Sequence, residues 1–133
     1  MEIKTKLYLV TSEGEKFMGI GVLWLLERVN TTGSIRAAAL SLGISYSKAF
    51  AMVKNLEEQL GLPVVDRRRG GANREGSVLT EFGRRFLILY DSFQNEAKQR
   101  LIEPFAKFTQ ECEQLLYEFT PLGEKERHCE NRK

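Results

Sequence analysis

The stretch TTGSIRAAALSLGISYSKAFAMVKNLEEQLG, residues 31–61, contains two helical segments separated by a short turn around Gly43. Ser34 is a suitable N-cap for the first segment, and Gly43 can adopt the left-handed conformation that ends many helices. Ser45 is a suitable N-cap for the second segment, which continues to Leu60. Two helices that are joined so closely must pack through small side chains, so this stretch predicts a helix-turn-helix.

The second helix of this pair has two chemically different faces. Its apolar residues recur at steps of three and four, which predicts a face that packs on the core. The predicted core residues are Ala49, Phe50, Val53, Leu56 and Leu60, together with Ala39, Leu42 and Ile44 from the preceding segment. The opposite face carries Tyr46, Ser47, Lys48, Ala51 and Lys54. Hydroxyl and lysine groups on such a face suit the major groove of DNA, whereas a helical hairpin in an unrelated bundle is the alternative interpretation.

The segment before residue 31 predicts a β-hairpin followed by a helix. TKLYLVTSEGEKFM, residues 5–18, alternates in polarity, turns at Glu13 and Gly14, and then resumes an extended pattern. From Gly21 onward the apolar residues have helical spacing, and Gly33 follows the last of them.

A basic segment follows the helix-turn-helix. LPVVDRRRGGANREGSVLT, residues 62–80, predicts a strand over 64–69, a tip that contains glycine, and a return strand over 77–79. The arginines of this predicted wing are Arg67, Arg68, Arg69 and Arg74. They are placed to reach flanking phosphates or a narrow minor groove. An RGG tract also occurs in disordered RNA-binding segments, but here it occurs once, between ordered apolar segments.

A long helix is predicted after Thr80, which is a suitable N-cap. Its apolar residues recur at steps of three or four as Phe82, Phe86, Leu89, Phe93, Ala97, Leu101, Phe105, Phe108, Cys112, Leu115 and Phe119. One small domain cannot cover so long a stripe, so we expect its distal half to pack against a second subunit. The predicted dimer interface is Phe86, Leu89, Phe93, Leu101 and Phe108. Pro104 predicts a kink or a break within this helix.

The positive charge of the chain is concentrated in one region. The 133 residues carry a formal net charge of +2. Residues 34–85 hold nine basic side chains against five acidic ones, whereas the segments on either side are neutral or acidic. A local basic surface attracts polyanions, although a charged segment is also common on solvated faces.

Other classes of function find no support in the motifs. The chain has no Walker-type phosphate loop, no nucleophile elbow and no zinc-protease motif, so we expect no enzyme and no cofactor. Cys112, Cys129 and His128 form neither a disulfide framework nor a metal site. The longest apolar run, residues 18–26, is about half of the ~20 residues that cross a bilayer, so we expect a cytoplasmic protein without membrane contact.

Three motifs together carry a resemblance to a known family. GSIRAAA (33–39), GISYSKAF (43–50) and LTEFGRRF (79–86) occur in this order, with the arginine-rich segment before the last. Over about residues 4–100 the chain resembles the N-terminal DNA-binding domain of ModE-type molybdate-responsive transcriptional regulators and, more distantly, LysR-type regulators. The resemblance implies a winged-helix homodimer on double-stranded operator DNA, with recognition-helix contacts from Tyr46, Ser47 and Lys48 and wing contacts from Arg67 to Arg69.

The chain departs from the ModE pattern at two places. Its wing tip reads GGANREGS (70–77), where the family usually has a run of glycines. The β-stranded oxyanion-binding module of full-length relatives is not recognisable, so we expect no molybdate site.

These observations predict a mainly α fold with small β-hairpins. We expect a winged helix-turn-helix over 1–80, a dimerisation helix over 81–120, kinked or broken, and a flexible tail over 121–133. The predicted DNA-binding residues are Ser34, Arg36, Ser45, Tyr46, Ser47, Lys48, Lys54, Arg67, Arg68, Arg69 and Arg74. The predicted function is sequence-specific transcriptional regulation. A protein-protein interaction module and a non-specific nucleoid-type DNA binder are the alternatives.

Overall fold

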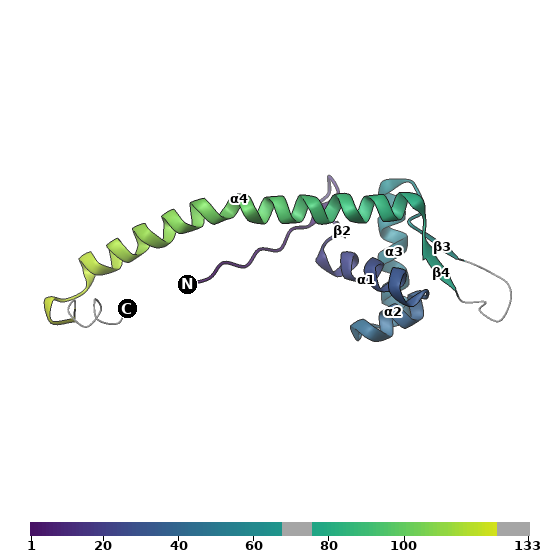
Figure 1. Ribbon diagram of the computed structural model, residues 1–133, viewed down its shortest axis with the longest axis horizontal. Coiled ribbons are helices and arrows are strands. Elements are labelled where there is room, and N and C mark those ends of the chain that lie inside the picture. The colour runs from purple at the N-terminus through teal and green to yellow at the C-terminus, as the bar shows by residue number, and fades with distance from the viewer. Residues whose placement is uncertain (68–75, 125–133) are drawn as a thin grey trace. The chain divides into compact units, whose positions relative to one another are not determined.

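The computed structural model describes residues 1–67 and 76–124. Figure 1 shows the elements, which are β1 (Leu9–Val10), β2 (Lys16–Met18), α1 (Ile20–Thr32), α2 (Ile35–Leu42), α3 (Tyr46–Leu60), β3 (Val65–Arg67), β4 (Ser77–Leu79) and α4 (Glu81–Phe119). The predicted fold class, mainly helical with two small antiparallel hairpins, is confirmed. The predictions for Arg68, Arg69, Arg74, His128 and Cys129 lie outside the described residues.

The chain forms two compact units. The first comprises Lys6–Gln94, which includes both hairpins, α1 to α3 and the beginning of α4. The second comprises Met1–Thr5 and Asn95–Lys133, and most of its described part is the remainder of α4. The first turns of α4 therefore belong to the unit that contains the helix-turn-helix.

The helix-turn-helix begins and ends at the residues that its sequence predicts. The Ser34 hydroxyl oxygen accepts a hydrogen bond from the Ala37 amide at 3.1 Å, and Ser45 does the same for the Lys48 amide at 3.1 Å. Gly43 has φ = 71°, the left-handed conformation that lets α2 end and the chain turn. Each cap satisfies backbone groups that the helix itself leaves unpaired.

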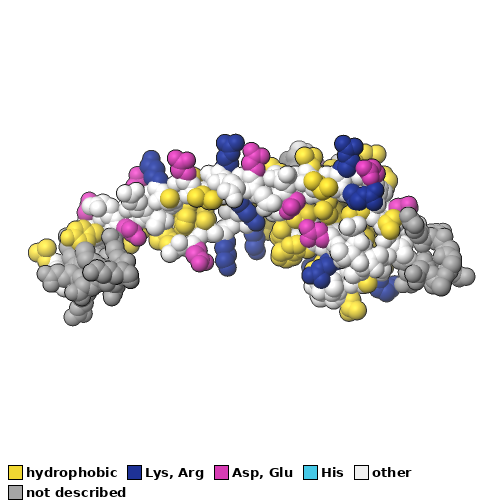
Figure 2. Space-filling view, viewed as in Figure 1, with side chains coloured by type: hydrophobic (Ala, Val, Ile, Leu, Met, Phe, Trp, Pro, Cys, Tyr) yellow, Lys and Arg dark blue, Asp and Glu magenta, His cyan; other side chains and the backbone are white. Residues whose placement is uncertain are grey.

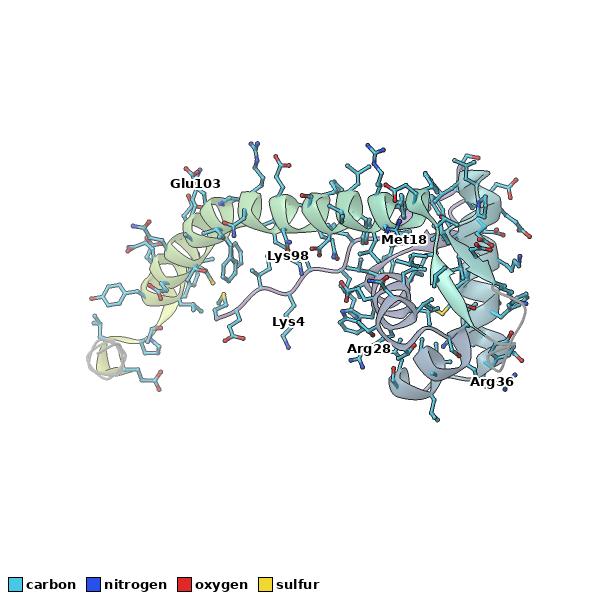
Figure 3. All side chains as sticks on the ribbon, turned by 45° about the vertical axis from the view of Figure 1, so that its right-hand side comes forward. Lys4, Met18, Arg28, Arg36, Lys98 and Glu103 are labelled. Carbon is cyan, nitrogen blue, oxygen red and sulfur yellow. The ribbon has the colours of Figure 1, made fainter. Side chains whose placement is uncertain are left out.

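The core of the first unit lies between α1, α2 and α3. Alanines allow the close approach of α2 and α3, since Ala39 and Ala49 are fully buried. Met18 from β2 extends this core and is labelled in Figure 3. Other buried members are Leu23, Leu25, Leu26, Val29, Ile35, Ala38, Val53, Leu56, Val64 and Leu79.

Phe50 corrects one prediction for this core. Its position, three residues before Val53, predicted a core residue, but Phe50 is only half-buried and is not part of the core cluster. The reason is its place at the border of the apolar face, where Arg67 from β3 covers its ring. Ala49 takes the core position beside it.

The two strands of the wing are anchored to the helices. Strands β3 and β4 pair antiparallel, with Arg67 opposite Ser77. The Ser77 amide donates a hydrogen bond to the Gly33 carbonyl at 2.7 Å, which ties β4 to the end of α1. The Glu57 carboxylate accepts hydrogen bonds from the amides of Val64 at 2.8 Å and Val65 at 3.3 Å. The wing base therefore has a fixed position relative to α1 and α3.

The start of α4 is capped and charged as its sequence predicts. Thr80 accepts a hydrogen bond from the Gly83 amide at 2.9 Å and donates its hydroxyl to the Pro63 carbonyl at 2.8 Å. Arg84 lies 2.6 Å from the Glu81 carboxylate, and this hydrogen bond lowers the pKa of Glu81. A negative side chain in the first turn also suits the positive end of the helix dipole.

The face of α4 that packs on the first unit differs from the predicted stripe. Gly83, Tyr90 and Gln94 are buried, and Phe86 packs beside them as a half-buried residue. Leu89 is 68% exposed and Phe93 is 49% exposed, although both belong to the predicted stripe. The stripe thus splits, because Phe86 faces the chain's own core whereas Leu89 and Phe93 face solvent.

Pro104 does not break α4. The helix is continuous from Glu81 to Phe119 (Figure 1), so of the two predicted outcomes, a kink or a break, the break does not occur. Proline removes one helical hydrogen bond, toward the carbonyl of Arg100, while the neighbouring turns keep theirs. Pro104 is also exposed, so water can reach the carbonyl that loses its donor.

Tyr90 should make stability depend on alkaline pH. Its hydroxyl donates a hydrogen bond to the Leu7 carbonyl at 3.0 Å, and burial, with a smaller effect of Tyr8, raises the pKa of Tyr90 above 10.0. Because the folded pKa exceeds the unfolded pKa, this stabilisation is complete below about pH 10 and is lost as the pH rises through the folded pKa. Tyr90→Phe should lower the free energy of unfolding by about 1 kcal/mol at neutral pH. It should also reduce the fall in the free energy of unfolding between neutral and alkaline pH, because the variant lacks the titrating hydroxyl. Urea unfolding at neutral pH and at about pH 11 measures both effects; an identical alkaline loss in both proteins would contradict them.

Candidate nucleic-acid interface

The outer face of α3 presents a short row of polar and small side chains. Ser47, Lys48, Ala51 and Lys54 are all exposed, whereas Ala49, Val53 and Leu56 point into the core. The row starts in the first turn of α3, next to the helix N-terminus. Positive lysine groups and a hydroxyl at this end of a helix are able to contact phosphates and base edges in a major groove.

Two aromatic rings on α3 hold two arginines from other elements. The Tyr46 and Phe50 rings stack with their centres 6.1 Å apart. The Arg36 guanidinium, from α2, lies 4.5 Å from the centre of the Tyr46 ring, and Figure 3 labels this residue. The Arg67 guanidinium, from β3, lies 4.3 Å from the Phe50 ring centre and donates a hydrogen bond to the Tyr46 hydroxyl at 3.4 Å. We call Tyr46 and Phe50 the aromatic platform.

The aromatic platform brings three predicted site residues together. Arg36, Tyr46 and Arg67 come from three elements, and a cation-π contact places each guanidinium over a ring. Sequence reasoning missed the role of Phe50 because it treated this residue as core. The sequence did contain a signal for this role of Phe50. An aromatic residue at the border of an apolar helix face is able to stack with a cation as well as pack against the core.

Lys54 extends this surface toward the base of the wing. Its ammonium nitrogen lies 3.5 Å from the Glu57 carboxylate and 5.6 Å from the Phe50 ring centre. The Lys54 side chain remains 54% exposed. Because an exposed ion pair of this kind contributes little, Lys54 is able to exchange its carboxylate partner for a phosphate at small cost.

Ser34 and Ser45 have a structural role in this surface. Both hydroxyl oxygens accept the capping hydrogen bonds described above, and Thr32 donates its hydroxyl to the Ser34 carbonyl at 3.1 Å. Ser34 is half-buried, whereas Ser45 is exposed. Their hydroxyl hydrogens still permit one contact each to a phosphate, as in many helix starts that bind anions.

The β1–β2 hairpin lies against the other side of α3, a feature that sequence reasoning missed. The Asn55 side-chain amide donates a hydrogen bond to the Lys16 carbonyl at 3.2 Å. The Lys16 ammonium lies 4.0 Å from the centre of the Tyr8 ring. Helix α3 is therefore flanked by Arg67 on one side and by Lys16 on the other. Nothing in the spacing of these residues indicated that Lys16 lies near α3.

The predicted dimer residues lie in different environments. Phe86 packs on the core of the first unit and Leu101 is half-buried, whereas Leu89, Phe93 and Phe108 are exposed. Exposed apolar side chains continue along the described part of the second unit, namely Ile102, Leu115, Leu116 and Phe119. Figure 2 shows hydrophobic side chains (yellow) between the charged ones along α4.

Within residues 1–67 and 76–124, no three histidine, cysteine or carboxylate side chains gather where they could hold a metal ion. In the same residues, every helix is too short or too polar to cross a membrane.

Comparison with known sequences places the helix-turn-helix in a family. Residues 21–84 match the family described as "Bacterial regulatory helix-turn-helix protein, lysR family". The chain is 34% identical over 90 residues to the molybdenum-pterin-binding protein MopB of Rhodobacter capsulatus, which covers 68% of this chain and 33% of MopB. It is 36% identical over 67 residues to the transcriptional dual regulator ModE of Escherichia coli K12, covering 50% of this chain and 26% of ModE. The chain thus spans a third or less of these relatives' length.

Solved structures share the fold. The CbnR_DBD-DNA complex superimposes with a TM-score of 0.54 at 24% identity, over 68% of this chain and 98% of that one. VV2_1132, a LysR family transcriptional regulator, superimposes with a TM-score of 0.50 at 23% identity, over 61% of this chain and 26% of that one. Residues 21–84 therefore form a lysR-type bacterial regulatory helix-turn-helix domain within a winged-helix fold, and the resemblance of the chain to ModE-type regulators is confirmed.

Proposed function

We propose that this protein is a sequence-specific regulator of transcription that binds double-stranded DNA through α3 and its two flanks. The observation that carries this proposal is the alignment of cations along one surface. Lys48 and Lys54 project from the exposed face of α3, while Arg36 and Arg67 lie over the aromatic platform beside it. The names of ModE and of the lysR family also describe regulators, which supports this proposal.

Different parts of this surface have different tasks in the proposal. Lys48 and Ser47, near the start of α3, enter the major groove and contact base edges. Arg67 contacts the backbone, because its guanidinium is already held at the base of the wing. Preorganised side chains lose less conformational entropy on binding, so the aromatic platform contributes to affinity by holding Arg36 and Arg67 in place.

A homodimer completes the proposal. The exposed apolar side chains of α4, among them Phe93 and Phe108, are the kind of surface that a second copy of the same helix covers. A symmetric dimer presents two recognition helices, so its operator has two half-sites in inverted orientation.

Selection of bound duplexes from a random pool tests the function directly. We expect enrichment of a consensus with two-fold symmetry, with half-sites about one helical turn or a multiple of it apart. Binding without enrichment would identify a non-specific DNA binder instead. The absence of any binding would leave the winged helix as a protein-binding module.

Two substitutions should separate base contacts from backbone contacts. Lys48→Ala should reduce discrimination between the consensus and a scrambled duplex, with a loss of about 1–3 kcal/mol that is specific to the consensus. Arg67→Ala should weaken binding to both duplexes equally and lower the salt slope by about two, that is, by about one for each subunit of the dimer. Fluorescence anisotropy titrations of both duplexes measure these effects. Equal behaviour of the two variants would contradict this assignment.

A further inference from the structure

An open pocket of about 490 Å³ lies between the β1–β2 hairpin, the start of α1 and α3. Its lining includes Tyr8, Lys16, Gly19, Lys48 and Asn55. All of these residues belong to the first unit, Lys6–Gln94. The pocket opens beside Lys48, the residue at which the proposed groove contact begins.

The charged side chains that line this pocket are positive. Within residues 1–67 and 76–124, only Lys16 and Lys48 bring a charge to the lining, and no carboxylate belongs to it. The pocket on the other side of α3 is different, because Glu57 and Glu58 line it together with Lys54. Of these two surfaces, the hairpin side is therefore the one that attracts an anion.

Lys16 is held in place at this pocket from two directions. Its carbonyl accepts the hydrogen bond from Asn55 of α3, which fixes the backbone of β2 against the recognition helix. Its ammonium group lies over the Tyr8 ring, 4.0 Å from the ring centre. Gly19 allows this arrangement, since a Cβ atom there would lie 2.9 Å from the Tyr8 ring. The ammonium is thus fixed while its remaining hydrogen-bond donors stay accessible, because Lys16 is exposed.

We propose that the β1–β2 hairpin is a third DNA-contacting element and that the pocket receives the sugar-phosphate backbone, with one phosphate bound by Lys16. This inference rests on the proposed function and extends its surface to the flank of α3 opposite the wing. Two observations favour the DNA backbone as the occupant of this pocket. The pocket is positively charged, and it adjoins the surface proposed to face the major groove, because Lys48 lines the pocket and is exposed on that side of α3. Recognition helix α3 is then clamped between two backbone contacts, Lys16 on one strand and Arg67 on the other.

The test compares charge-matched variants on the selected duplex. Lys16→Gln removes the charge and keeps much of the stem that packs on Tyr8, whereas Lys16→Arg keeps the charge. Arg28→Gln, at an exposed position of α1 outside the pocket, is the control for a change in net charge. Melting temperatures establish that all three variants are folded.

We expect Lys16→Gln to lower the slope of log Kd against log salt concentration by about 1.8, because each of the two subunits loses one phosphate contact worth about 0.9. Lys16→Arg and Arg28→Gln should keep the wild-type slope. In hydroxyl-radical footprints, Lys16→Gln should lose protection of one backbone segment per half-site and keep the remainder.

An unchanged slope and footprint in Lys16→Gln would overturn the proposal. So would binding of inorganic phosphate at Lys16 without any effect of Lys16→Gln on DNA, since the pocket would then hold a small free anion. The proposed function fails separately, if the wild-type protein binds no duplex at all.

Discussion

Gly83→Ala is expected to destabilise the protein by about 2–4 kcal/mol, although alanine is the better helix former by about 1 kcal/mol. A Cβ atom on Gly83 would overlap the Val64 carbonyl oxygen and would lie 3.0 Å from its carbonyl carbon. These are backbone atoms, so no side-chain rotation relieves the overlap. The start of α4 would have to move away from Val64, the residue before β3, which strains the hydrogen bond from the Thr80 amide to the Val64 carbonyl.

Thermal unfolding followed by circular dichroism measures this effect. Each kcal/mol lowers the melting temperature of a domain of this size by about 4–8 °C, so a fall of about 8 °C or more is expected. Gly21→Ala is the matched control, because a Cβ atom there meets only the Met52 methyl group at 3.9 Å. Gly21→Ala should leave the melting temperature unchanged or raise it. A stabilised Gly83→Ala protein would show that the contact between Gly83 and the Val64 backbone is not as close as described.

Phe108→Asp is expected to convert a dimer into monomers and to weaken binding to a two-half-site operator by about 100-fold or more. Phe108 is 56% exposed in the single chain, so a carboxylate there does not disturb the fold of one subunit. In a dimer interface the same carboxylate would be buried without a partner, which costs several kcal/mol by order of magnitude. Loss of the second subunit removes the effective concentration that links two half-site contacts.

Sedimentation equilibrium and gel shifts on whole and half operators measure these two effects together. Gln110→Asp adds the same charge on the opposite side of the helix, and it should leave both dimerisation and affinity unchanged. Phe108→Asp should bind a half operator as the wild type does. A wild-type protein that is monomeric at micromolar concentration would remove the proposed dimer.

The helix-turn-helix was predictable because every signal in it is local. Ser34, Gly43 and Ser45 act on backbone groups within a few residues, so caps and turn follow from the sequence alone. Lys48 and Lys54 were also predictable as exposed, since they lie opposite Val53 and the other core residues of one helix.

The buried face of α4 was not predictable from hydropathy. The prediction favoured large apolar residues and therefore chose Leu89 and Phe93, whereas the helix buries Tyr90 and Gln94 one position later. Tyr90 is only 3% exposed because its hydroxyl finds the Leu7 carbonyl, a partner far away in the sequence. A hydropathy pattern contains no information about such partners.

The contacts on the two sides of α3 could not be predicted from the sequence for a similar reason. Contacts of Arg67 with the aromatic platform and of Lys16 with Asn55 join residues that are distant in the sequence. Each depends on where a hairpin packs against α3, and the spacing of residues within one element does not determine that position.

The salt dependence of DNA affinity tests the central claim most directly. The Kd of the wild-type protein for its selected duplex is measured by fluorescence anisotropy between about 50 and 200 mM salt. If the cations beside α3 neutralise at least about four phosphates per dimer, the Kd should rise by about 100-fold or more across this range. A Kd that is independent of salt, or no measurable binding to duplex DNA, would contradict the account.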